Sequence, residues 1–147
     1  MTPSEAETLR ALLRGARTIA VVGLSPNPMR PSNSVARYLQ RSGYKIVPVN
    51  PGHGEILDEK SYRTLTEAAR DYAIDIVDVF RRSEHVGAIV DEAIALRPPP
   101  QMIWLQLGVV DAAAGRRAEA AGIGPSHAAV CQGAPAQRQW RVVAVAR

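Results

Sequence analysis

The sequence predicts an α/β protein, a Rossmann-like three-layer α/β/α sandwich built on a mainly parallel sheet. Short runs rich in Val and Ile alternate with amphipathic helical segments four times along the chain. Each segment between two such runs is long enough to cross over the sheet, as parallel strands require. A length of 147 residues is typical of one domain, so residues 1–147 are expected to form a single domain.

Four strands are expected at the Val- and Ile-rich runs. The first, residues 18–23, is apolar on both faces, as is typical of a central strand between two helical layers. The others fall at residues 45–50, 75–80 and 101–108. Pro48 in the second run indicates a strand end or an irregular pairing, because proline has no N–H group to donate to a neighbouring strand.

Helices are expected between the strands and at the N-terminus. Residues 1–17 are amphipathic and are expected to form the N-terminal helix, with Gly15 as the signal for its end. The later helices are expected to start at hydroxyl side chains, which can accept a hydrogen bond from a free N–H group. These candidate caps are Ser32 or Ser34 after the first strand, Thr64 or Thr66 after the second, and Ser83 after the third. Val35, Tyr38 and Leu39 are expected to point inward from the first of these helices.

The composition argues against several classes of protein. The net charge of +4 is modest and the arginines are scattered, which disfavours nucleic acid and favours a small anionic ligand. One cysteine makes no internal disulfide, and the three histidines lack the spacing of metal ligands. There is no signal-peptide pattern and no apolar run near the roughly 20 residues that span a bilayer. We therefore expect a cytoplasmic protein that binds neither membrane nor metal, while the sequence identifies no protein partner.

In an open parallel sheet, ligands bind outside the carboxyl ends of the strands, so the residues at those ends are the candidates for a site. They are Gly23, Ser25, Pro26, Arg30 and Ser32 after the first strand, Asn50, Pro51 and His53 after the second, Phe80 and Arg81 after the third, and Gln106, Leu107 and Gly108 after the fourth.

This set of residues has a consistent chemistry. Gly23 permits a tight turn and a close approach of the backbone to a ligand. The serines offer short hydrogen-bond donors, and Arg30 and Arg81 bring positive charge, to which His53 can add. Phe80 supplies an apolar wall, and the set contains no acidic residue. The candidates therefore predict a site for phosphates and a flat ring.

Two observations argue against an NAD site, although an NAD(P)-dependent oxidoreductase remains the alternative from another class. The loop after the first strand has only Gly23, not the G-x-G-x-x-G pattern, and the second strand ends in Asn50 where NAD sites carry an acid. A neutral strand end instead suits a ligand with a phosphate on its ribose. No catalytic pair is evident either, because Asp75 and Asp78 lie three apart on one strand, on opposite faces.

Four segments carry a resemblance to a known family: residues 21–39 (VVGLSPNPMRPSNSVARYL), 47–51 (VPVNP), 75–86 (DIVDVFRRSEHV) and 104–110 (WLQLGVV). The chain resembles the small bacterial CoA-binding proteins, stand-alone relatives of the CoA-binding domain of the succinyl-CoA synthetase α subunit, from about residue 19 to residue 122. CoA carries a 3′-phosphate on its ribose, in agreement with the neutral strand end.

The resemblance implies a Rossmann-like domain that binds CoA or an acyl-CoA without catalysis of its own. It places Gly23, Ser25, Pro26 and Arg30 around the pyrophosphate, Val49, Asn50 and Pro51 beside the adenosine, and Phe80, Arg81, Gln106, Leu107 and Gly108 along the remaining wall. An acyl-CoA ligase would also need a phosphohistidine segment and an ATP-grasp domain, which a partner subunit would have to supply. The third possibility is a regulatory sensor, in which the binding of CoA controls a partner protein.

The C-terminal part departs from the family pattern. A helix is expected at residues 111–122 and one more strand within residues 140–146, but residues 123–147 lack the apolar strand and the Met-x-Arg-Cys-like segment of the relatives. Codons for residues 126–133, SHAAVCQG, read one nucleotide out of phase, permit Val-Met-x-Arg-Cys-Val-Lys. We therefore hypothesise a frameshift in the gene, which resequencing of the DNA tests. A less favoured interpretation relates residues 123–133 to the IGPNCPG turn of the synthetases.

Overall fold

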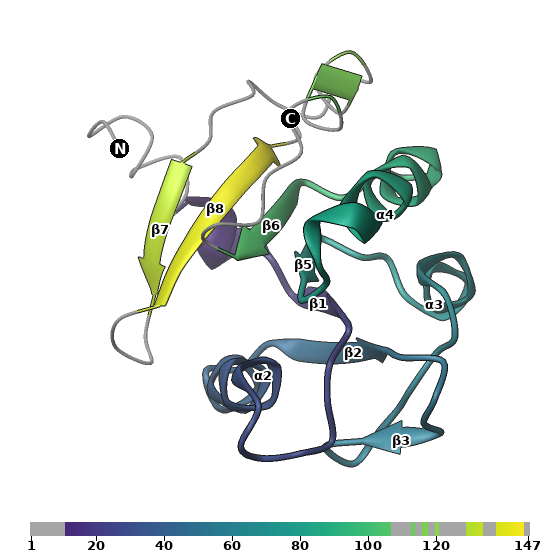
Figure 1. The fold of residues 1–147 in the computed structure, drawn as a ribbon, viewed down its shortest axis with the longest axis vertical. Coiled ribbons are helices and arrows are strands. Elements are labelled where there is room, and N and C mark those ends of the chain that lie inside the picture. The colour runs from purple at the N-terminus through teal and green to yellow at the C-terminus, as the bar shows by residue number, and fades with distance from the viewer. Residues whose placement is uncertain are drawn as a thin grey trace.

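The computed structural model describes residues 11–106, the single positions 113, 116, 117 and 120, and residues 129–133 and 138–145. Figure 1 shows a twisted sheet with helices on both sides. The six-stranded sheet has the order β2-β1-β5-β6-β8-β7. Its parallel part comprises β1 (Thr18–Val22), β2 (Lys45–Val49), β5 (Ile76–Val79) and β6 (Met102–Gln106).

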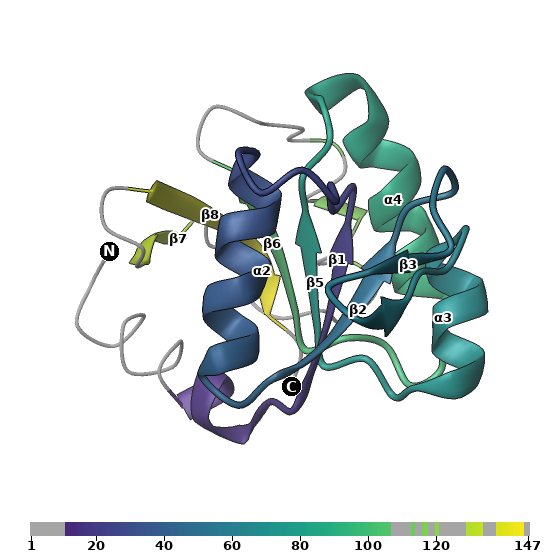
Figure 2. The same cartoon turned by 90° about the horizontal axis from the view of Figure 1, so that it is seen from below.

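Three helices cover the two faces of this parallel part (Figure 2). Helix α2 (Pro31–Arg41) lies on one face, and α3 (Leu65–Asp71) and α4 (Ser83–Ala95) lie on the other. Alternate residues of each strand face opposite layers, as the twofold repeat of a strand requires. In β1, Ile19 and Val21 pack on the α2 side, whereas Ala20 and Val22 pack on the side of α3 and α4. The structure thus confirms the Rossmann-like three-layer fold that the sequence predicts.

The strand expectations hold for the parallel sheet, and they hold in part beyond it. Pro48 lies on β2, the edge strand, where its missing N–H group disturbs no central ladder. Strand β8 (Arg138–Val145) covers most of the expected last strand, and it pairs antiparallel with β6. Strand β7 (Ala129–Gly133), which pairs antiparallel with β8, was not expected.

A small hairpin that the sequence does not predict lies between β2 and α3. It joins β3 (Glu55–Ile56) to β4 (Glu59–Lys60) in antiparallel pairing. Its turn places Leu57 and Asp58 at positive φ, at 55° and 62°, without a glycine to signal it. Ile56 is buried on the α2 side of the sheet, so tertiary packing holds this short hairpin in place.

Two helix starts differ from the expected ones, and one agrees. Helix α2 begins at Pro31 with Arg30 as its N-cap residue, because proline fits the first helical position and the Ser32 hydroxyl is engaged elsewhere. Helix α4 begins at Ser83 itself, with Arg82 at the cap position. Thr64 caps α3 as expected, since its hydroxyl accepts a hydrogen bond of 3.1 Å from the N–H group of Glu67.

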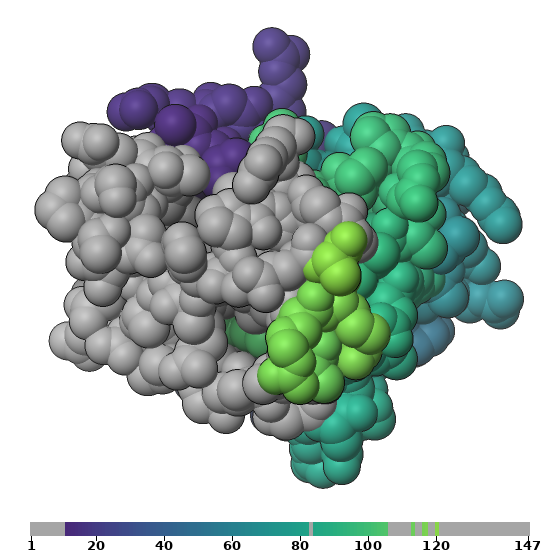
Figure 3. Space-filling model, turned by 90° about the horizontal axis from the view of Figure 1, so that it is seen from above, coloured from purple at the N-terminus to yellow at the C-terminus, as the bar shows by residue number. Residues whose placement is uncertain are grey.

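The remaining helical expectations have mixed outcomes. Val35 and Leu39 are buried under α2, but Tyr38 is 43% exposed, so its expected inward position is wrong. Residues 11–15 are helical, while the expected start of that helix lies outside the described residues. In the space-filling view the light green residues 113, 116, 117 and 120 lie against α4 (Figure 3), where Arg117 pairs with Asp91 at 2.7 Å.

Candidate functional site

The order of the strands fixes where a ligand can enter the sheet. The chain passes from β1 through α2 to β2 on one side of β1, and then through α3 to β5 on the other side. The carboxyl ends of β1 and β5 therefore form a topological switch point, where the two connections diverge and leave a crevice.

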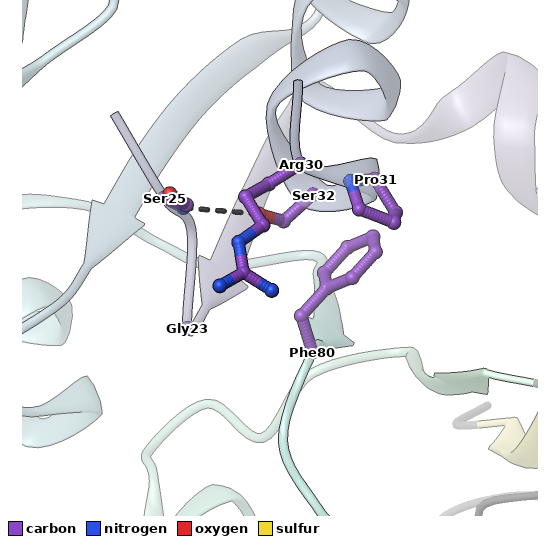
Figure 4. Close-up of a pocket in the computed structure, with 6 residues that line it drawn as sticks. All are labelled: Gly23, Ser25, Arg30, Pro31, Ser32 and Phe80. Carbon is purple, nitrogen blue, oxygen red and sulfur yellow. Dashed lines mark hydrogen bonds between the residues drawn. The ribbon is translucent and has the colours of Figure 1, made fainter. Parts of the chain in front are cut away.

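A cavity of about 390 Å³ lies at this switch point. Its lining consists of Gly23, Ser25, Arg30, Pro31, Ser32 and Phe80 (Figure 4). The size is within the roughly 300–1,000 Å³ of small-molecule sites. Five of these six residues are among the candidates from the sequence, so the structure brings together the residues that follow the first and third strands.

Gly23 forms the floor of the cavity, and its backbone needs the freedom of glycine. Its φ is +84°, in the left-handed region that other residues rarely adopt. A Cβ atom here would lie 3.0 Å from Cδ of Arg81 and closer still to the carbonyl oxygen of Phe80. Glycine is therefore required because the ends of β1 and β5 approach one another closely, in addition to any approach of a ligand.

The loop from β1 to α2 is held in shape by its own side chains. The N–H group of Ser25 donates to the Ser32 hydroxyl (3.0 Å), and the Asn33 amide donates to the Ser25 carbonyl (2.9 Å). Asn27 accepts a hydrogen bond of 2.9 Å from the N–H group of Met29. Ser32 and Asn33 are buried, although they belong to the first turn of a helix. The cavity wall is therefore preorganised before any ligand binds.

Asn50 connects this loop to the end of β2. Its Nδ2 atom donates to the carbonyl of Leu24 (2.9 Å), and its Oδ1 atom accepts from the N–H group of Gly52 (2.9 Å). The Gly23 N–H group in turn donates to the carbonyl of Val49 (2.9 Å). Asn50 is expected beside a ligand, and in the structure both polar atoms of its side chain bond within the protein.

Three arginines lie at the cavity or in the residues directly after β5. In Figure 4 the Arg30 guanidinium extends into the space between Gly23 and the Phe80 ring. Arg81 and Arg82 follow β5 directly and are exposed. Within the part of the chain that the structure describes, the side chains of Arg30, Arg81 and Arg82 have no hydrogen bond or ion pair with protein groups. Such free guanidinium groups beside a helix N-terminus favour an anion.

The other candidates lie around the cavity or outside the described residues. Pro26 is on the rim loop, Pro51 and His53 are exposed in the turn after β2, and the Val49 side chain is buried on the side of α3 and α4. Gln106 is the last residue of β6. Leu107 and Gly108 lie outside the described residues. Asn33, expected as a short hydrogen-bond donor after the first strand, donates within the protein to the carbonyl of Ser25, eight positions away.

The acidic residues on β5 and directly before it lie away from the cavity or inside the core. Asp75 accepts hydrogen bonds from the N–H groups of Arg17 (2.8 Å) and Thr18 (3.0 Å), at the end of β1 away from the cavity. Asp78 is fully buried, and this burial raises the pKa of its carboxyl well above the usual value. Among the described residues there is no group of three or more His, Cys, Asp or Glu side chains that could hold a metal ion.

The described helices include none with the length and apolar character that a membrane span needs. The fold and the cavity together define the class as a Rossmann-like α/β protein with a cationic crevice at its switch point. Residues 17–130 match the family model of the CoA binding domain, and the chain belongs to this family.

Several known proteins are similar to this chain. The chain is 42% identical over 109 residues to the uncharacterised protein YneT of Bacillus subtilis (strain 168). This match covers 74% of this chain and 77% of YneT. A hypothetical protein from Pyrococcus horikoshii OT3 has a similar structure, with a TM-score of 0.73, 33% identity and 79% of each chain covered. The structure of cell-free ID.343 from Thermus thermophilus matches with a TM-score of 0.70 and 37% identity, covering 79% of this chain and 85% of that one.

Proposed function

We propose that this protein binds CoA or an acyl-CoA in the cavity at the carboxyl ends of β1 and β5, and that it catalyses no reaction by itself. Membership of the CoA binding domain family supports a CoA ligand in general. The location rests on one observation above all, namely that a free arginine, Arg30, extends into a preorganised cavity at the switch point of the sheet.

The chemistry of the cavity suits the diphosphate of CoA. The guanidinium of Arg30 can pair with phosphate oxygens through two hydrogen bonds. The first turn of α2, with Ser32 in the wall, adds the positive end of a helix dipole. None of the six lining residues is acidic, so nothing in the lining repels the phosphates. Phe80 offers an apolar surface to the uncharged part of the ligand.

A binding role without catalysis is consistent with the acid–base groups of the described residues. Asp75 is engaged by backbone N–H groups, and Asp78 is enclosed in the core away from solvent. His53 is exposed in the turn after β2 and does not line the cavity. We further propose that the chain acts as a single domain in the cytoplasm, with a small molecule as its ligand.

Thermal unfolding with a panel of ligands tests this function. A ligand that binds only the folded state stabilises it by RT ln(1 + [L]/Kd), or about 2.7 kcal/mol at a hundredfold excess over Kd. We expect the largest rise in Tm with CoA, a smaller rise with 3′-dephospho-CoA and little change with NAD. A larger rise with NAD than with CoA would overturn the proposal and favour the oxidoreductase alternative.

The location of the site is tested by Arg30→Ala, with Arg41→Ala as the matched control. Arg41 is an exposed arginine in the last turn of α2, at the end of the helix away from the cavity. Loss of one charge-assisted hydrogen-bonding group should weaken CoA binding by about 1–3 kcal/mol in Arg30→Ala. Calorimetric titration should give the wild-type affinity for Arg41→Ala. Equal affinities for the two variants would remove Arg30 from the site.

A further inference from the structure

Asn50 occupies the strand end where dinucleotide-binding folds carry an acid that binds the ribose hydroxyls. Its two hydrogen bonds, to the Leu24 carbonyl and from the Gly52 N–H group, explain why an amide stands here. The first bond needs a donor, which an ionised carboxylate lacks. The second needs an acceptor, which an amide also supplies. Asn50 therefore holds two loops together without adding a charge.

The segment of the chain that contains Asn50 carries no negative charge. Residues 45–54, which include β2 and the turn after it, contain no Asp or Glu. Two hydrogen bonds hold the turn, since the carbonyl of Asn50 accepts from the side-chain hydroxyl of Ser61 (3.1 Å) and from the backbone N–H group of His53 (3.4 Å). His53, the titratable group in this turn, is exposed.

We propose that Asn50 determines specificity for a phosphorylated ribose. Its side chain makes the two hydrogen bonds, to the Leu24 carbonyl and from the Gly52 N–H group, that join the two loops, and we call this pair of bonds the latch. Asn50 makes the latch without the negative charge of an acid. This inference rests on the proposed function and adds a rule for discrimination at the same site. The adenosine of the ligand would lie at the end of β2, and its 3′-phosphate would face a neutral amide. An acid at the same position would repel that phosphate, whereas the hydroxyls of an unphosphorylated ribose would donate hydrogen bonds to it.

The test compares two ligands, CoA and 3′-dephospho-CoA, against three chains by calorimetric titration at constant, low ionic strength. The chains are the wild type, Asn50→Asp and Asn50→Ala. Asn50→Ala removes the latch and adds no charge, so it should weaken both ligands by a similar factor. Asn50→Asp also loses the donor to Leu24, but its charge should weaken CoA by a further factor of about ten or more relative to 3′-dephospho-CoA. The ratio of the two affinities separates charge from loosened structure.

Each result has a distinct meaning. A ratio that is the same in Asn50→Asp and Asn50→Ala would overturn the role of Asn50 in specificity while leaving CoA binding intact. A wild-type chain that binds neither ligand would overturn the proposed function itself. Should Asn50→Asp fail to fold, His53→Asp places an acid in the same turn without touching the latch. The same selective loss of CoA affinity is then expected, and an unchanged ratio would refute the inference.

Discussion

Replacement of Gly23 by alanine tests how closely β1 and β5 approach at the cavity. The φ of +84° costs an alanine about 1–2 kcal/mol. The added Cβ also overlaps the carbonyl oxygen of Phe80 and contacts Arg81 Cδ at 3.0 Å, so the two strand ends must separate. That movement weakens the hydrogen bond of 2.8 Å from the Phe80 N–H group to the Val22 carbonyl, worth about 0.5–1.5 kcal/mol.

The sum of these effects is a loss of about 1.5–3.5 kcal/mol in the free energy of unfolding. At this chain length it corresponds to a fall in Tm of roughly 4–12 °C. Urea unfolding followed by circular dichroism measures the loss directly.

Gly43 supplies the matched control. Its φ is also positive, at +101°, but a Cβ atom there would meet nothing within 4 Å. Gly43→Ala should therefore show the backbone cost of about 1–2 kcal/mol alone. The difference between the two variants isolates the steric overlap at Phe80. Equal losses for Gly23→Ala and Gly43→Ala would refute the close approach of β1 and β5.

Three further substitutions test other interactions. Burial raises the pKa of Asp78, so the folded state holds this proton more strongly, and stability falls as the pH rises above the unfolded pKa of about 3.9. Asp78→Asn should therefore raise the unfolding free energy by roughly 1–3 kcal/mol at pH 7 and by less at pH 4. An equal gain at the two pH values would contradict this. The hydrogen bond to Asp71 and burial raise the pKa of Tyr62 to about 12, so the stability of the protein should decline as the pH rises from 10 towards 12. The absorbance of the tyrosinate reports the ionisation. Tyr62→Phe should remove this decline. Thr64→Ala should cost about 1 kcal/mol in urea unfolding, and no change would show that the hydrogen bond to Glu67 adds nothing.

The sequence was sufficient for the parallel sheet because its signals are local. β1, β2, β5 and β6 are short β-branched runs buried on both faces, and their spacing leaves room for crossover helices. The β3–β4 hairpin gives no such signal, since each strand has two residues and the turn has no glycine. The start of α2 was misplaced for a related reason, because the Ser32 hydroxyl bonds to Ser25 across the loop and does not cap the helix.

The candidate site divides in the same way. Gly23, Ser25, Arg30, Ser32 and Phe80 follow strand ends, and the rule for ligands in parallel sheets was enough to select them before the cavity was known. The role of Asn50 was not accessible from the sequence, because its partner Leu24 is 26 positions away.

The sequence by itself determined which segments form strands and helices, their order, and the edge of the sheet at which polar and cationic residues collect. It did so because periodicity, chain length and turn residues act over a few neighbouring positions. Only the tertiary structure decided that β1 and β5 lie close enough to exclude any side chain at Gly23, and that Asn50 joins two loops. These contacts depend on strand register and packing between distant segments, which no local pattern encodes.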